Sequence, residues 1–169
     1  DTGEQMFSAI EKMIDNFGSK IGLIVVDSLA AIIPTKEFEA ELADDQYAAK
    51  ARMMAKGLRK INNKLGRTEI ALVFINQLID NIGGYGTTTP GGRALKFYSS
   101  MRIEMETEKK FAANDNGIGI EVTVRKNKCG PPLSITGQFL EFGKGFNKQY
   151  DLFRASLERG DILKNGGWY

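Results

Sequence analysis

The sequence predicts an α/β protein with a mainly parallel sheet, helices flanking that sheet, and antiparallel strands added at one edge. Two observations carry this prediction. The first half alternates amphipathic helical patterns with two short apolar runs, residues 23–27 and 69–76, an order typical of parallel strands joined through helices. The second half shows apolar residues at every second position in residues 101–106 and 118–125, which is typical of an antiparallel hairpin.

The composition is that of one globular domain and excludes several kinds of site. The chain has 169 residues, of which 42% are hydrophobic and 26% charged, and its net charge is +2. We therefore treat residues 1–169 as one domain. It has no histidine, which excludes His-based triads and His-ligated metals. The single cysteine, Cys129, cannot form an internal disulfide, and a reducing compartment fits. No apolar run approaches the roughly 20 residues of a membrane helix, so no membrane partner is expected.

Each element of the first half follows from its own pattern. Apolar residues at helical spacing over 6–17 predict an amphipathic helix. The β-branched run 23–26 predicts a strand buried on both faces. Acids at 44–45 favour a helix start, and an apolar stripe over 47–65 predicts a long helix with a basic opposite face. Residues 69–76 predict a second buried strand.

The second half adds a loop and further strands. Residues 83–92, rich in Gly and Thr, predict a flexible loop that orders on a partner. This loop is not a phosphate-binding loop, because no G-x-x-x-x-G-K-[ST] pattern occurs in the chain. A polar turn at 114–117 joins the two alternating segments. Residues 133–142 predict one more strand, and 147–159 predict a last helix.

Two polar residues follow the apolar runs of the first half. Four apolar residues before Asp27 and Ser28 resemble a Walker B strand, and an acid at such a strand tip can hold Mg²⁺ through its water shell. The alternative is an acid that caps the following turn. Gln77 follows Asn76 at the tip of the next buried strand, near the same ligand crevice. Alternatively, it is a helix- or turn-forming amide.

Two groups of cations are candidates for binding anions. The first lies on the basic face of the long helix and consists of Lys50, Arg52, Lys56, Arg59, Lys60 and Lys64. These side chains could neutralise phosphates, although a solvated helix face has the same pattern. The second group is Lys126 and Lys128, which bracket Asn127 at a strand end. These two ammonium groups either point at an anion or make a sheet edge soluble.

Six blocks occur in order along almost the whole chain: LIVVDSLAAIIPTKEFEAEL, ARMMAKGLRKI, ALVFINQ, TTTPGGRALKFYSSMRIE, VRKNK and GGWY. In this order and spacing they resemble the bacterial RecA recombinase family. The resemblance implies a RecA-like P-loop NTPase core from a cytoplasmic DNA-dependent ATPase. It further implies that ATP and Mg²⁺ drive a helical homo-oligomeric filament on single-stranded DNA, which exchanges strands with double-stranded DNA.

The resemblance also implies roles for residues near the nucleotide. Asp27, with Ser28 beside it, corresponds to the Walker B acid. Gln77 corresponds to the glutamine that senses the γ-phosphate of ATP and passes the signal to the DNA loop. Lys126 and Lys128 correspond to two lysines that reach the γ-phosphate on the adjacent subunit, where they stabilise charge in the transition state.

The DNA-binding residues follow from the same resemblance. Residues 39–47 correspond to the first DNA-binding loop and residues 78–93 to the second. Phe97 corresponds to an aromatic residue that relays between subunits. The implied DNA contacts are Tyr47, Arg52, Arg59, Ile82, Tyr85, Thr89, Gly91, Gly92 and Arg93.

The chain departs from the family pattern in several places. Its second loop is shorter, Ile79 and Asn81 stand where the family carries basic residues, and Arg93 stands where Asn is usual. We expect the Walker A loop, the catalytic glutamate and an oligomerisation helix before Asp1, and a further domain after Tyr169. This chain alone is therefore expected to be inactive.

Two other functions compete with the recombinase interpretation. One is a hexameric helicase, which the blocks GGRALKFY and VRKNK disfavour. The other is a degenerate, non-catalytic RecA fold that binds DNA or protein.

Overall fold

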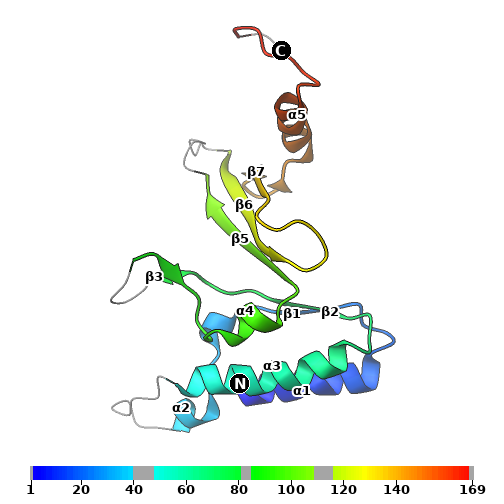
Figure 1. The fold of residues 1–169 in the computed structure, drawn as a ribbon, viewed down its shortest axis with the longest axis vertical. Coiled ribbons are helices and arrows are strands. Elements are labelled where there is room, and N and C mark those ends of the chain that lie inside the picture. The colour runs from blue at the N-terminus through cyan, green and yellow to red at the C-terminus, as the bar shows by residue number, and fades with distance from the viewer. Residues whose placement is uncertain (1, 40–47, 81–84, 109–115, 168–169) are drawn as a thin grey trace. The chain divides into compact units, whose positions relative to one another are not determined.

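The computed structural model describes residues 2–39, 48–80, 85–108 and 116–167 (Figure 1). They form two compact units, residues 1–99 and residues 100–169. The first unit contains α1 (Gly3–Phe17), β1 (Leu23–Val26), the short 3₁₀ helix η1 (Leu29–Ala31), α2 (Thr35–Glu39), α3 (Ala49–Leu65), β2 (Ala71–Phe74), β3 (Ile79–Asp80), β4 (Thr87–Thr88) and α4 (Ala94–Tyr98). The second contains β5 (Met101–Thr107), β6 (Gly117–Asn127), β7 (Ile135–Glu141), β8 (Gly145–Phe146) and α5 (Lys148–Arg159).

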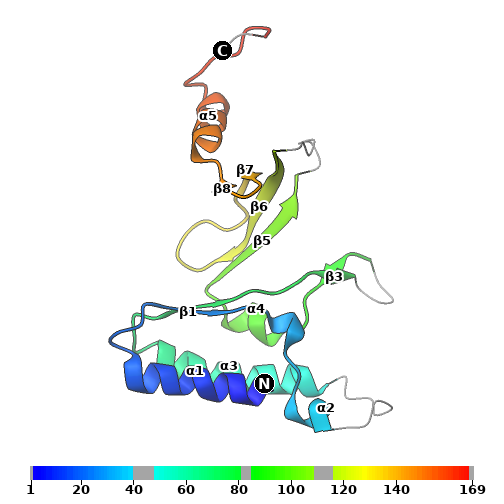
Figure 2. The same ribbon diagram turned by 180° about the vertical axis from the view of Figure 1, so that it is seen from behind.

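Helix α1 confirms the first predicted helix and begins with a capping box. The backbone N–H of Gln5 donates to the Thr2 hydroxyl, and the Thr2 N–H donates back to Gln5 Oε1 at 2.9 Å. This arrangement satisfies two amide groups that the first helical turn cannot bond itself. Helices α1 and α3 lie side by side along the β1–β2 pair (Figures 1 and 2).

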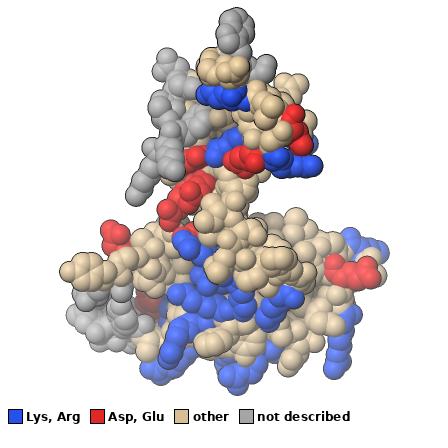
Figure 3. All heavy atoms as spheres, turned by 45° about the horizontal axis from the view of Figure 1, so that its top comes forward, with Lys and Arg blue, Asp and Glu red and all other residues tan. Residues whose placement is uncertain are grey.

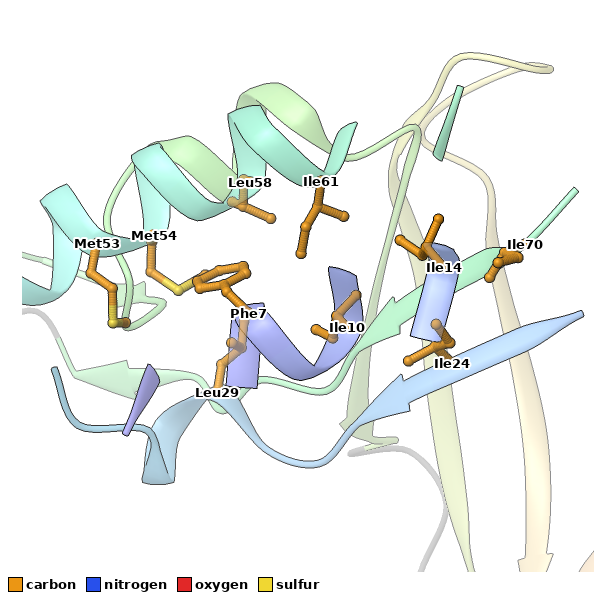
Figure 4. Packing of buried hydrophobic residues seen from close by; sticks show 10 residues of the cluster. All are labelled: Phe7, Ile10, Ile14, Ile24, Leu29, Met53, Met54, Leu58, Ile61 and Ile70. Carbon is orange, nitrogen blue, oxygen red and sulfur yellow. The ribbon is translucent and has the colours of Figure 1, made fainter. Parts of the chain in front are cut away.

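The core of the first unit lies where these two helices meet the strands (Figure 4). Its buried members come from α1, β1, η1, α3 and the residue before β2, and are Phe7, Ile10, Ile14, Ile24, Leu29, Met53, Met54, Leu58, Ile61 and Ile70. The apolar residues of α1 and α3 recur at spacings of three and four, so each helix turns one stripe inward. Helix α4 packs on the same cluster through Ala94, Leu95 and Tyr98.

Strands β1 and β2 pair in parallel, as predicted, with Ile24 opposite Leu72 and Val26 opposite Phe74. The prediction that these strands are buried on both faces is wrong for the described residues, because Leu23 is 57% exposed and Val25 is 51% exposed. Helices α1 and α3 cover one face of the pair. Since side chains of a strand alternate between faces, every second residue remains in contact with solvent.

The Gly/Thr-rich segment is partly ordered rather than a plain loop. Thr87 and Thr88 form β4 and pair antiparallel with β3, with Ile79 opposite Thr88 and Asp80 opposite Thr87. The prediction of a structureless stretch over 83–92 therefore fails at β4. Residues 83–84 lie outside the described residues.

The second unit is an antiparallel sheet in the order β5-β6-β7-β8. Its central hairpin confirms the predicted alternating segments, with Ile103 opposite Val124 and Met105 opposite Val122. Asn147 caps the start of helix α5, because its side-chain oxygen accepts from the Tyr150 N–H at 2.9 Å.

The expectation of a mainly parallel sheet is not confirmed. Within the described ranges, β1 and β2 are the one pair of strands that run parallel, apart from an isolated parallel bridge between Thr2 and Ile33, and the other strand pairs are antiparallel. The antiparallel strands of the second unit form their own sheet instead of extending β1–β2. Of the helices in the described part of the chain, none has the length and hydropathy that a membrane span requires.

Candidate functional site

The carboxyl ends of β1 and β2 bring three of the predicted nucleotide residues, Asp27, Ser28 and Gln77, to one edge of the first unit. The parallel register sets Val26 opposite Phe74. Beyond that pair, the Ile75 N–H donates to Val26 O and the Leu29 N–H donates to Ile75 O, both at 2.9 Å. The two chains therefore stay bonded past the end of the strands. Asp27 lies within this bonded stretch and is exposed.

The groups at this edge are all oxygen or amide donors and acceptors. Asp27 offers a carboxylate and Ser28 a hydroxyl, and neither side chain bonds to a described residue. Gln77 follows two residues after Ile75 and is exposed. No cluster of three or more His, Cys, Asp or Glu side chains suited to a metal occurs among the described residues. This edge could therefore hold a hard cation through one carboxylate and water, but its described side chains do not supply enough ligands to enclose a metal ion.

Asn76 connects this edge to the Gly/Thr-rich segment. Its Nδ2 donates to the carbonyl of Pro90 at 3.0 Å, and its Oδ1 accepts the Gln77 N–H at 3.0 Å. Both ends of the amide are thus used, and the side chain is partly buried. Sequence reasoning noted Asn76 only as the neighbour of Gln77. No sequence pattern signals this contact, because it joins a side chain to a backbone carbonyl 14 positions away.

The segment after Pro90 lies directly on helix α3. Gly91 has φ +94° and Gly92 has φ +72°, a backbone region that disfavours side chains. A Cβ added at Gly91 would lie 3.5 Å from Met54 Cγ, and one added at Gly92 would lie 3.0 Å from Ala51 Cβ. Glycine at both positions therefore allows the backbone to approach the helix closely.

Helix α3 presents exposed cations beside this contact. Arg52 and Arg59 are exposed on α3, and Arg93, which precedes α4, is also exposed. Figure 3 shows Lys and Arg side chains gathered on one face of the first unit. Lys50 differs from them, because its Nζ donates to Ala30 O at 3.0 Å and burial lowers its pKa.

The other predicted DNA contacts lie on the Gly/Thr-rich segment or outside the described residues. Tyr85 is fully exposed and Thr89 is partly buried. Tyr47 and Ile82 lie outside the described residues, as do the predicted helix-starting acids at 44–45. Phe97 is 70% exposed on α4.

The lysine pair lies in the second unit, at the end of β6. Lys126 stands opposite Arg102 of β5, and Lys128 donates its backbone N–H to Ser100 O at 2.9 Å. Burial, followed by the charges of Lys128 and Arg102, lowers the pKa of Lys126. Sequence reasoning missed Arg102, which the register adds to the corner as a third cation.

Comparison with known proteins decides the family. A family model of the RecA N-terminal domain matches residues 1–147. The chain belongs to the RecA family. It is 38% identical over 174 residues to "Protein RecA" of Fusobacterium nucleatum, aligning 100% of this chain with 46% of that protein. It is also 40% identical over 173 residues to Protein RecA of Ureaplasma parvum, covering 99% of this chain and 51% of the relative.

A third relative, Protein RecA of Borreliella burgdorferi, is 40% identical over 177 residues, with 100% of this chain and 48% of the relative aligned. The chain thus spans about half the length of the curated RecA proteins it matches. These matches confirm the family that the six ordered blocks resemble. The roles of single residues in this RecA chain remain predictions.

Proposed function

We propose that this chain is the part of a DNA-dependent ATPase that faces DNA and senses the bound nucleotide. In this proposal the complete protein uses ATP and Mg²⁺ to assemble a helical filament on single-stranded DNA in the cytoplasm. The filament then promotes homologous strand exchange with double-stranded DNA. Membership of the RecA family supports the proposal.

The proposal rests on one hydrogen bond, between Asn76 and Pro90. The Asn76 amide bonds Pro90 at 3.0 Å and so joins the strand end that bears Gln77 to the segment packed on α3. A nucleotide site and a DNA site can influence each other when a continuous set of bonds and packed groups connects them. Gln77 would sense the γ-phosphate of ATP, and Asn76 would transmit its position to the loop.

The DNA side uses backbone and cations together. Arg52 and Arg59 on α3, with Arg93 beside them, would neutralise phosphates. Gly92 is exposed and carries no side chain, so its N–H group would be open to a phosphate oxygen, and the buried Gly91 would position this backbone. The triple variant R52A/R59A/R93A should bind single-stranded DNA more weakly, with a shallower dependence on salt. Unchanged affinity in this variant would remove these residues from the proposed site.

The loop supplies the contacts with bases. Tyr85 is fully exposed, as a side chain that stacks on an unpaired base must be. Thr89 would donate its hydroxyl to the backbone of the strand. Tyr47 and Ile82 complete the proposed set from positions outside the described residues.

Asp27 and Ser28 fit a magnesium ion held through its water shell. Both offer oxygen, and one carboxylate suffices when nucleotide phosphates supply the other ligands. Bound there, the ion would neutralise charge on the phosphoryl oxygens. Asp27 would hold its water shell in place, and Ser28 would lie beside it.

Two further contacts are proposed between subunits. Lys126 and Lys128 would reach the γ-phosphate held by an adjacent subunit and stabilise the charge that develops on it. Arg102, opposite Lys126 on β5, would add a third positive charge to this corner. Phe97, exposed on α4, would contact the neighbouring subunit and relay the state of its nucleotide.

The proposal is tested by ATP hydrolysis of the complete gene product with and without single-stranded DNA. We expect DNA-stimulated turnover that D27N abolishes, while E69Q, which changes an exposed acid without an ion pair to a described residue, retains it. A complete protein that binds DNA without hydrolysing ATP would instead be a degenerate, non-catalytic module. The 169-residue chain alone should show no hydrolysis, because it contains no G-x-x-x-x-G-K-[ST] pattern.

A further inference from the structure

The cations of α3 differ in what they contact. Lys60 forms an ion pair with Glu11 of α1, and Lys64 forms one with Asp15 of the same helix. Lys64 also lies 3.8 Å from Glu11. These two lysines therefore neutralise acids on α1 and hold the two helices together.

Three other cations of α3 form a separate stripe. Arg52, Lys56 and Arg59 are all exposed, and none forms an ion pair or a side-chain hydrogen bond with a described residue. Their spacing of four and then three places them on one face of the helix. The stripe extends along about 10 Å of the helix axis, given a rise of 1.5 Å per residue.

The stripe adjoins a segment that is poor in positive charge. Gly92 lies against Ala51 of α3, one residue before the stripe begins. In the hairpin that leads to this glycine, the described residues 78–80 and 85–92 carry Asp80 as their one charged side chain. A polyanion that passes over this hairpin therefore depends on neighbouring elements, above all α3, for its counter-charge.

We propose that Lys56 is a third phosphate-binding side chain, which links Arg52 and Arg59 into one continuous track for a single strand of DNA. The proposal rests on the proposed DNA-binding function and adds a residue to it. Lys56 lies between the two arginines along the stripe, and its flexible stem lets the ammonium reach a phosphate as a point charge. Lys50, Lys60 and Lys64 are excluded because each already bonds within the fold.

The salt dependence of DNA binding measures the contact directly. Each phosphate contact to a single strand steepens the plot of log affinity against log salt by about 0.7. We take the contribution of this contact to DNA affinity as zero at about 1 M salt. Removing the contact then lowers the affinity about 8-fold at about 50 mM salt and about 3-fold at about 200 mM salt. We expect these changes for K56A, measured by fluorescence anisotropy with labelled oligo-dT and the complete gene product bound to a non-hydrolysable ATP analogue.

Lys60 provides the matched control. K60A removes the same charge from the same helix, four residues further along, but the lysine it removes is paired with Glu11. Any effect of net charge alone appears equally in both variants, so the difference between them isolates a specific contact. K56R keeps a cation at the position and should restore the wild-type slope.

Each outcome has a distinct meaning. A shallower slope in K56A than in K60A, restored in K56R, supports the track. If R52A and R59A weaken binding while K56A matches K60A, the inference about Lys56 is wrong but the DNA site stands. If none of these variants changes affinity or slope, the proposed DNA function of α3 fails together with the inference.

Discussion

Gly57 decides how closely α1 and α3 pack, and its replacement by alanine sets two known effects against each other. Gly57 lies inside α3, where alanine is favoured over glycine by about 1 kcal/mol in an exposed helix. A Cβ at this position, however, would lie 2.5 Å from Cδ2 and Cε2 of the Phe7 ring on α1. Phe7 is buried, with 6% of the residue's surface exposed, and belongs to the core cluster.

At this position the cost of overfilling the core should exceed the gain in helix propensity. Overfilling a packed core costs about 1–3 kcal/mol, and contacts this short with a rigid buried ring call for the upper part of that range. After subtracting the propensity gain, we expect G57A to lower the free energy of unfolding by about 1–2 kcal/mol. The measurement is urea unfolding monitored by far-ultraviolet circular dichroism. The slope of the unfolding free energy against urea concentration should be the same as in the wild type.

A second variant separates the two effects. F7L removes ring atoms from the contact, so the double variant F7L/G57A should be more stable than the sum of the two single changes predicts. If G57A instead raises the free energy of unfolding by about the propensity difference, Phe7 does not pack tightly against position 57, which refutes the expected clash.

Two further predictions concern the loop contact and the second unit. Alanine at Gly92 or Gly86 must adopt a left-handed conformation in either case, which costs about 1–2 kcal/mol. Only the Gly92 variant also meets Ala51, so G92A should weaken binding of single-stranded DNA far more than G86A, and equal affinities would contradict this. Hydrogen bonds from Arg125 lower the pKa of Glu104 below its ordinary 4.5. The ionised Glu104 therefore stabilises the folded state fully above about pH 4.5, and this stabilisation is lost as the pH falls through the lowered pKa. E104Q should therefore lose less stability than the wild type below about pH 4.5 in acid unfolding, and parallel curves would contradict the linkage.

The elements with strong periodicity could be predicted from the sequence. Helices α1 and α3 have long apolar stripes, and the β5–β6 hairpin has strict alternation. The burial of β1 could not be predicted in the same way. Its apolar run is compatible with cover on either face, and only three-dimensional packing leaves Leu23 and Val25 exposed. The β3–β4 pairing escaped prediction because two-residue strands are too short for a periodic signal.

The candidate site likewise contains residues that a sequence pattern indicates and contacts that no pattern indicates. Asp27 and Gln77 could be located because each follows a recognisable strand. The bond from Asn76 to Pro90 spans 14 positions and joins a side chain to a backbone carbonyl, so no pattern in the sequence indicates it. The cations of α3 were likewise one group in the sequence, because the acids that pair with Lys60 and Lys64 lie 49 residues away on α1.

The two bonds of Asn76 have a thermodynamic consequence for the proposed function. One amide group holds Gln77 at its oxygen and Pro90 at its nitrogen, at 3.0 Å each. If a nucleotide at Gln77 favours one position of this amide, it also favours one position of the loop. Binding equilibria are reciprocal, so DNA that holds the loop must increase nucleotide affinity by the same factor that nucleotide increases DNA affinity. N76A should remove that shared factor from both measurements at once, leaving two sites that bind independently.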